Sequence, residues 1–446
     1  MSFPRYPKYK DSGVKWLGEV PEHWGIAPLK AVTSHNDEVL AEDTPPDYEI
    51  AYVDISGVET NVGITAKETM PFASAPSRAR RRVRHGDVIV STVRTYLRAI
   101  ARIVHPEDNL IASTGFAVIR PRSTLSAEFV GYMLSANYFI EQVIARSTGV
   151  SYPAINASEL VAIPALLPPR PEQSAIAAFL DRETAKIDAL IAEQQRLIEL
   201  LQEKRQAVIS QAVTKGLNPD APMKDSGNPG IGQVPIHWCV DKMKWVARME
   251  SGHTPDKKIE AYWENCEIPW VSLNDTGYLK EHDYISDTAY RVNELGIANS
   301  SARLLPERVV VFSRDATIGR CAITTRPMAV SQHFIAWVCG DDIFPEYLLM
   351  RLRSMTQELE RLTTGATLKT IGMPDVRTLQ TPVPPLDEQK SVVAYIQRSC
   401  ADIDLFIAAA EKTITLLQER RSALISAAVT GQIDVRGFSS GGSEAA

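Results

Sequence analysis

The stretch Val20-Pro21-Glu22-His23-Trp24 occurs twice in this chain, and its repetition decides the organisation of the fold. It returns as Val234-Pro235-Ile236-His237-Trp238, an offset of 238 − 24 = 214 residues. A Lys-Asp-Ser-Gly segment precedes both copies, at 10–13 and at 224–227. A fixed offset between similar segments is typical of a duplicated structural unit. The sequence therefore predicts two related halves in one chain.

A second repeated segment opens a long helical stretch in each half. Pro168-Pro169-Arg170-Pro171-Glu172-Gln173 returns as Pro384-Pro385-Leu386-Asp387-Glu388-Gln389, an offset of 388 − 172 = 216 residues. Both helical stretches end in Ala-Val-Thr. We therefore predict a tandem fusion of one unit, a globular domain followed by a helical arm. The expected boundaries are a first domain at 1–167, a first helix at 168–217, a second domain at 218–383, a second helix at 384–433 and a flexible tail at 434–446.

The two arms show a heptad pattern. Pro171 suits the first turn of a helix and Asp387 suits an N-cap position. Apolar residues then follow in steps of three and four, and a helix of about 40 residues is roughly 60 Å long. We expect the arms to pair with each other, antiparallel, as a rigid spacer; packing of each arm on its own domain is the alternative. The seam positions are Ile176, Leu180, Ile187, Leu190, Gln194, Leu197, Leu201 and Val208 in the first arm and Val392, Ile396, Ile403, Phe406, Ala410, Leu417 and Leu424 in the second.

Composition limits the class of protein. A chain of 446 residues with 44% hydrophobic residues can bury the cores of two domains. Its five cysteines are spread out and include no Cys-x-x-Cys pair, which favours neither a disulfide framework nor a metal site. We find no export segment and no apolar run of about 18 residues. The expected location is the cytoplasm.

Charge is distributed unevenly along the chain. The net charge is −6, but residues 78–102 hold eight arginines and one acid, and residues 303–326 hold five arginines and two acids. Such clusters favour contacts with phosphates. A solvated arginine surface without a ligand is the alternative.

Short apolar runs predict strands in both domains. They lie at 87–91, 99–104 and 115–120 in the first half and at 268–273, 308–312 and 333–338 in the second. Helices are expected at 127–147 and 345–362. The predicted fold class is α+β, with two mixed α/β domains separated by two long antiparallel coiled-coil helices in a pseudo-two-fold arrangement.

Several spaced segments carry a resemblance to a known family, namely residues 10–18 with 21–24, 86–91, 251–255, 268–272 and Pro-Pro-x-x-Glu-Gln at 168 and 384. Together they resemble the specificity subunit of type I restriction-modification systems. The resemblance implies that each half holds a target recognition domain, which reads one half of a bipartite duplex DNA target, while the helices set the spacer. It also implies docking of methyltransferase subunits, two being expected, which bind S-adenosylmethionine and methylate adenine, and of restriction and translocase subunits.

Motifs for catalysis are weak. An amino-methyltransferase needs Asn/Asp-Pro-Pro-aromatic, and the nearest segment, Thr44-Pro45-Pro46-Asp47-Tyr48, has no suitable first residue. The matching segment at 13–18 lacks one of the three glycines of 227–232, because Trp16 stands in place of Gly230, and this disfavours a cofactor loop. We therefore expect a non-catalytic subunit without a cofactor of its own. Two alternatives are a coiled-coil protein-interaction scaffold without DNA reading and a self-sufficient DNA enzyme.

Loops that follow strands are the expected DNA-reading segments, because arginine and amide side chains recognise bases there. A surface salt bridge or a turn is the alternative role for each residue. Trp24, Trp238 and Trp270 are expected to anchor cores, and His253 and His333 to make structural hydrogen bonds. The candidates are Arg94, Tyr96, Arg98, Ser151 and Tyr152, with Arg80, Arg81 and Arg82 on phosphates, in the first domain, and Asn274, Asp275, Arg314, Thr317, Thr367 and Lys369 in the second.

Overall fold

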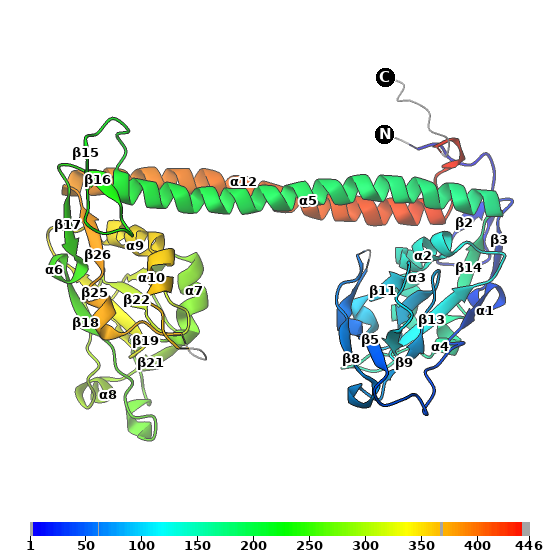
Figure 1. Cartoon of the computed structure of the whole chain (residues 1–446), viewed down its shortest axis with the longest axis horizontal. Coiled ribbons are helices and arrows are strands. Elements are labelled where there is room, and N and C mark those ends of the chain that lie inside the picture. Colours follow the sequence, from blue (N-terminus) through cyan, green and yellow to red (C-terminus); the bar gives the residue numbers. More distant parts are fainter. Residues whose placement is uncertain (1–2, 61, 366–368, 439–446) are drawn as a thin grey trace. The chain divides into compact units, whose positions relative to one another are not determined.

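The computed structural model describes residues 3–60, 62–365 and 369–438 of the chain (Figure 1). Contacts divide the chain into two compact units. Unit 1 contains the residues up to 195 together with those from 412 onward, and unit 2 contains residues 196–411. Each unit combines sheets with helices, so the α+β class is confirmed. The long helices α5 (Arg170–Lys215) and α12 (Leu386–Val429) each contribute one part to each unit.

Unit 1 is built on two four-stranded sheets. The orders are β11-β10-β13-β4, which is entirely antiparallel, and β8-β5-β12-β9, in which β5 and β12 are parallel. Its elements are β1 (Tyr9–Asp11), β2 (Glu19–Pro21), β3 (Gly25–Pro28), α1 (Leu29–Val32), β4 (Thr33–His35), β5 (Glu49–Val53), β6 (Val58–Glu59), β7 (Gly63–Ile64), β8 (Glu68–Pro71), β9 (Ala79–Arg82), β10 (Val88–Ser91), β11 (Ile100–Arg102), β12 (Leu110–Ser113), β13 (Phe116–Pro121), α2 (Ala127–Ser135), α3 (Asn137–Arg146), α4 (Ala157–Leu160) and β14 (Pro164–Leu167).

Unit 2 contains a five-stranded sheet, order β18-β25-β22-β23-β20, and a three-stranded sheet, order β21-β19-β24. Its elements are β15 (Met223–Asp225), β16 (Gln233–Pro235), β17 (Cys239–Lys242), α6 (Met243–Val246), β18 (Ala247–Ser251), β19 (Ile268–Val271), α7 (Thr276–Glu281), β20 (Tyr284–Ile285), β21 (Tyr290–Val292), α8 (Glu294–Ala298), β22 (Val310–Ser313), β23 (Cys321–Thr324), β24 (Ala329–Val330), β25 (Phe334–Cys339), α9 (Pro345–Ser354), α10 (Thr356–Arg361), α11 (Met373–Val376) and β26 (Gln380–Val383).

The six predicted strands are confirmed as β10, β11, β13, β19, β22 and β25. Each predicted helix is instead divided in two. Ala136 has extended backbone angles, φ −74° and ψ 144°, which end α2 before α3 begins. Met355, with φ −87° and ψ 13°, separates α9 from α10. A continuous apolar pattern cannot reveal such a break, because both segments bury residues in one core.

The repeated Glu-Gln pair anchors each long helix to its own domain. Gln173 is buried; its Oε1 accepts from the Ser126 N–H at 2.8 Å, and its Nε2 donates to the carbonyls of Thr124 and Pro168. Gln389 makes the corresponding bonds to Phe344, Asp342 and Pro384. The first turn of each long helix is therefore held on its own domain.

Replacing Gln173 with leucine is expected to lower the free energy of unfolding by about 3 kcal/mol, because it leaves a buried N–H and two carbonyls without this partner. Urea denaturation of the full chain, followed by circular dichroism, measures the effect. Gln195 is an exposed residue of the same helix, so Gln195→Leu is the matched control and is expected to change stability by under about 0.5 kcal/mol. Equal effects of the two substitutions would show that the anchor contributes nothing.

The repeated tryptophans lie against the ends of the long helices. Trp24 is fully buried in unit 1, and its indole N–H donates to Glu172 at 3.0 Å. Gly431, which follows α12, has φ +72°, and a Cβ there would lie 2.4 Å from Pro21. Trp238 is also fully buried, in unit 2, beside Gly216, which has φ +72° as well. The prediction that both tryptophans anchor cores is confirmed.

The two long helices run antiparallel within each unit. In unit 1, Asp188 pairs with Arg421 at 3.3 Å, and the earlier residue Ile176 shares a core with the later residue Val429. In unit 2, Arg205 lies 3.6 Å from Asp404, and α5 residues near Ile209 share a core with the start of α12. The predicted antiparallel pairing is therefore confirmed within the units. The first turns of each helix also pack on their own domain, which was the alternative.

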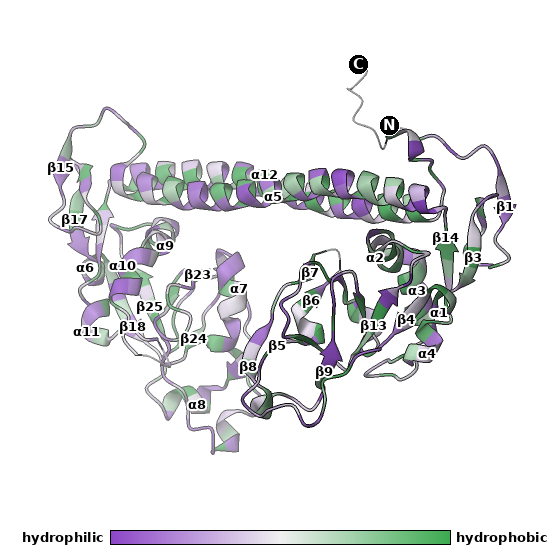
Figure 2. Ribbon diagram, turned by 45° about the vertical axis from the view of Figure 1, so that its right-hand side comes forward, coloured by the Kyte–Doolittle hydropathy of each residue, from purple (hydrophilic) through white to green (hydrophobic). Residues whose placement is uncertain are grey.

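The seam differs from the prediction in its register. Leu190, Leu197 and Phe406 are 45%, 42% and 63% exposed, whereas the next residues along the chain, such as Ile191 and Ile198, are partly buried. Figure 2 shows hydrophobic and hydrophilic residues alternating along both helices. The other seam positions of both arms are buried or partly buried, namely Ile176, Leu180, Ile187, Gln194, Leu201, Val208, Val392, Ile396, Ile403, Ala410, Leu417 and Leu424.

Two predicted chain features need correction. Asp387 is the second residue of α12 rather than its N-cap, because the helix already begins at Leu386. Residues 434–438 are not a flexible tail: Val435 is buried and the Phe438 ring contacts Phe3 and Phe179. Residues 439–446 lie outside the described residues. No helix in the described part of the chain is both long and apolar enough to cross a membrane.

Candidate DNA-recognition loops

Two loops of unit 1 are joined through their backbones. Residues 92–98 follow β10, and residues 148–154 follow α3. Val93 and Thr148 both pair with Ala154, and the Ile155 N–H donates to the Thr92 carbonyl at 2.9 Å. This pairing brings together five candidates from two distant segments, namely Arg94, Tyr96, Arg98, Ser151 and Tyr152, all of which are exposed.

Arg94 and Arg98 have left-handed backbone conformations, with φ of 50° and 55°. Such conformations are strained for residues other than glycine, and strained residues cluster at functional sites. The Arg94 guanidinium lies 4.9 Å from the centre of the Tyr152 ring, which is 65% exposed. Arg98 pairs with Glu141 at 2.9 Å. The loops thus present a cation and an aromatic ring side by side to solvent.

The three arginines of β9 do not share one face. Arg80 stacks on Phe72, with 4.8 Å between the guanidinium and the ring centre, and Arg82 is exposed. Side chains alternate along a strand, so Arg81 projects to the opposite side. Burial lowers the pKa of Arg81, and its Nε has no hydrogen-bond partner in the described residues. Arg80 and Arg82 are therefore better placed for phosphates than Arg81.

Acidic side chains from other segments neutralise part of the arginine cluster. Arg78 pairs with Asp54 at 3.0 Å, and Arg84 pairs with Glu38 at 2.8 Å. Both acids lie outside residues 78–102. The local charge is therefore lower than the sequence count indicates.

The same loop pairing recurs in unit 2. Asp315 and Thr364 both pair with Thr370, and the Ile371 N–H donates to the Arg314 carbonyl at 2.9 Å. The Ala316 N–H donates to the Lys369 carbonyl at 2.8 Å. Two candidates on these loops, Thr317 and Lys369, are exposed. Thr367 lies outside the described residues.

Arg314 and His333 hold these loops in place. The Arg314 guanidinium donates to the carbonyls of Gln332 and Ile371, at 3.2 and 3.1 Å. His333 Nδ1 lies 2.8 Å from the buried carboxylate of Asp315, which also accepts from Thr370. The expected structural role of His333 is confirmed, and Arg314 ties two backbone carbonyls together.

Asn274 and Asp275 follow β19 in a short turn. The Asp275 carboxylate is buried and accepts from the backbone N–H groups of Ser272 and Ala289, at 2.8 and 2.7 Å. Asn274 is exposed. Asp275 therefore holds the turn, and Asn274 is the residue that it presents.

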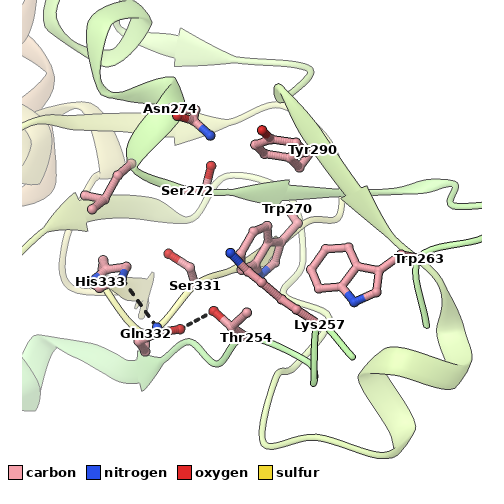
Figure 3. A pocket seen from close by; sticks show the side chains of 11 residues that line it. Thr254, Lys257, Trp263, Trp270, Ser272, Asn274, Tyr290, Ser331, Gln332 and His333 are labelled. Atoms are coloured by element: carbon pink, nitrogen blue, oxygen red, sulfur yellow. Dashed lines mark hydrogen bonds between the residues drawn. The ribbon is translucent and has the colours of Figure 1, made fainter. Parts of the chain in front are cut away.

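Asn274 also lines a cavity of about 480 Å³ that the sequence did not indicate (Figure 3). Trp263 and Tyr290, from a loop and from β21, line it together with Trp270. The pairing of Trp270 with Tyr290 across β19 and β21 is a long-range contact, for which no motif spacing gives a signal. Trp270 is buried as expected, but it also forms a wall of this cavity.

Two α+β domains, each with a pair of backbone-joined loops that present exposed polar side chains, share two long helices and define a modular recognition protein. The sequence profile of the type I restriction modification DNA specificity domain matches residues 81–201 and 235–409. The chain belongs to this family.

Curated relatives and solved structures agree with this assignment. The putative type I restriction enzyme MjaX specificity subunit of Methanocaldococcus jannaschii is 22% identical, over 96% of this chain and 98% of that subunit. The MjaIX specificity subunit of the same organism is 28% identical, over 37% of this chain but only 38% of that subunit. The HsdS subunit from Thermoanaerobacter tengcongensis has the same fold, with a TM-score of 0.53 over 95% of this chain and all of that one, at 23% identity. A solved structure of a type I R-M system aligns with a TM-score of 0.70, over 93% and 99% of the two chains, at 23% identity.

Proposed function

We propose that the chain is the DNA-sequence-specificity subunit of a type I restriction-modification complex. The observation that carries this proposal is the family match, which covers residues 81–201 in the first half and 235–409 in the second. In the proposal, each unit reads one half of a bipartite duplex target, and α5 and α12 set the spacer in a pseudo-two-fold arrangement.

The loop geometry supports a division of roles among the candidates. Arginine and amide side chains can read base edges, so the exposed residues of the paired loops and Asn274 are proposed to face bases. Arg80 and Arg82 are proposed to contact phosphates. Asp275 and Arg314 position the loops, because their polar atoms are bonded to backbone groups.

The chain is proposed to be non-catalytic and cytoplasmic. Methyltransferase subunits, two in number, would supply S-adenosylmethionine and the methyl transfer, and restriction and translocase subunits would join the same complex. Leu190, Leu197 and Phe406 are exposed apolar residues on the long helices, which makes them candidates for docking these partners.

Genome-wide mapping of N6-methyladenine, in cells with and without this chain, tests the proposal. The expected result is a bipartite methylated motif with a gap of fixed length, which disappears on deletion and returns when the chain is restored. An unchanged methylation map would contradict DNA reading and favour the protein-interaction scaffold. Methyl transfer by the purified chain alone would contradict the non-catalytic role.

A further inference from the structure

The cavity of about 480 Å³ in unit 2 has walls made of aromatic rings. The ring centres of Trp263 and Trp270 are 5.6 Å apart, at an interplanar angle of 78°. The Trp263 indole N–H donates to the Asp256 carbonyl and the Trp270 indole N–H to the His253 carbonyl, each at 3.2 Å. Both rings are therefore held in place before any ligand arrives, which favours recognition of a flat aromatic group.

Tyr290 adds a third ring that a ligand can reach. It lies opposite Trp270 in the register of β19 and β21 and is 53% exposed. The volume of the cavity falls within the usual range for small-molecule sites, roughly 300–1,000 Å³. It can therefore hold a ligand as large as a mononucleotide.

The charge at this cavity selects the chemical class of the ligand. Lys257 lines it (Figure 3), whereas the described residues of the lining include no Asp or Glu. An aromatic cage binds a cationic ligand because the ring faces attract the cation, and the positive charge of Lys257 would repel such a ligand. A flat ring that carries an anionic group fits both the aromatic walls and the ammonium.

The cavity also contains polar groups that can form hydrogen bonds with the edge of a ligand ring. Asn274 presents an exposed amide, the side-chain type that reads adenine by paired hydrogen bonds. Ser331 also lines the cavity, and its buried Oγ has no hydrogen-bond partner in the described residues (Figure 3). The Gln332 amide is engaged by Thr254 and His333 and so belongs to the frame of the site.

Unit 1 has different chemistry at the matching strand. Tyr52 in Glu49-Ile50-Ala51-Tyr52-Val53 corresponds to Trp270 in Glu267-Ile268-Pro269-Trp270-Val271. The Arg78 side chain donates to the Tyr52 hydroxyl at 3.2 Å and pairs with Asp54 at 3.0 Å. The aromatic site is therefore a property of one half and not of the shared frame.

We infer that the cavity of unit 2 binds a nucleobase together with its 5′-phosphate. The base stacks on Tyr290 and the tryptophan walls, Asn274 faces the base edge, and Lys257 contacts the phosphate. The nucleotide is either free in solution or turned out of a DNA duplex. Only the second source rests on the proposed function.

Calorimetry with the full-length chain tests this inference. The free probes are dAMP, deoxyadenosine and 2-deoxyribose 5-phosphate, which lacks the base. The DNA probes are a duplex with one unpaired adenine and the same duplex with an abasic site at that position. Tyr290→Ala is the test variant, and Tyr395→Ala is the matched control, because Tyr395 is a tyrosine of α12 that is 46% exposed, against 53% for Tyr290.

Binding of dAMP, or preference for the unpaired adenine over the abasic site, is expected to fall roughly tenfold in Tyr290→Ala and to stay unchanged in Tyr395→Ala. If dAMP is bound more tightly than deoxyadenosine, Lys257→Ala should make the two affinities equal. Binding of dAMP identifies a free nucleotide, and base preference in the duplex alone identifies an extrahelical base.

The inference is overturned if neither probe shows dependence on the base, or if Tyr290→Ala binds as well as Tyr395→Ala does. Cellular methylation separates this result from failure of the proposed function. A chain that directs methylation but binds neither probe retains the proposed function and loses the nucleotide site. A chain that binds dAMP but directs no methylation retains the site and loses the proposed function.

Discussion

A chain with four residues added to each long helix is expected to recognise the same two half-sites with one or two more base pairs between them. Four helical residues add about 6 Å, and base pairs are stacked about 3.4 Å apart. The insertions belong between 195 and 196 and between 411 and 412, where the two units meet along the chain. No element of either domain is then interrupted. The original target, with its shorter gap, is expected to lose methylation.

The control replaces four exposed residues of each long helix next to these insertion points and adds none. It should leave the motif and its gap unchanged. Circular dichroism of both variants checks that the long helices are retained. An unchanged gap in the lengthened chain would contradict the role of the helices as a spacer. Altered bases in either half-site would show that the insertion disturbs the recognition loops.

The strands of the domain cores could be predicted because their apolar runs are local. Val88, Ile89 and Val90 are all buried in β10, and Val310, Val311 and Phe312 are all buried in β22. A short apolar run bounded by polar turns fits a buried strand, and its β-branched residues favour a strand over a helix. The long helices were predictable for the same reason, since their period continues over many turns.

The register of the helix seam could not be predicted from period alone. Leu190 is followed by Ile191, Leu197 by Ile198, and Phe406 by Ile407. Either member of each pair fits steps of three and four residues. Which one is buried depends on the partner helix, and the isoleucines are the less exposed members.

The positions of the recognition loops were predictable, but the role of each side chain was not. The buried carboxylate of Asp275 accepts a hydrogen bond from the N–H of Ala289, 14 positions away. The Arg314 guanidinium donates to the carbonyl of Ile371, 57 positions away. Arg78 and Arg84 find their acids outside the cluster. These partners come together only in the folded chain, so sequence spacing gives no sign of them.

Exchange of residues 33–156 for those of another member of the family is expected to change one half of the methylated motif completely and to leave the other half unchanged. This segment begins at β4 and ends at the N-cap of α4. It includes both joined loops, because Val93 pairs with Ala154. The exchanged segment leaves out β3 and β14, which pair with each other, so this pair and the long helices remain those of the original chain.

The equivalent exchange in unit 2, of residues 247–372, is the matched control. It carries the corresponding loops of unit 2, in which Asp315 pairs with Thr370, and leaves β17 paired with β26. This exchange is expected to alter the other half of the motif only. Both chimaeras should keep the same gap, because α5 and α12 are untouched.

Mapping N6-methyladenine across the genome, in cells that carry the first of these chimaeras, tests most directly whether each domain reads its own half-site. The expected result is a methylated motif with one new half, one original half and the original gap. A motif in which both halves change, or one identical to that of the parent chain, would contradict separate reading by the two domains.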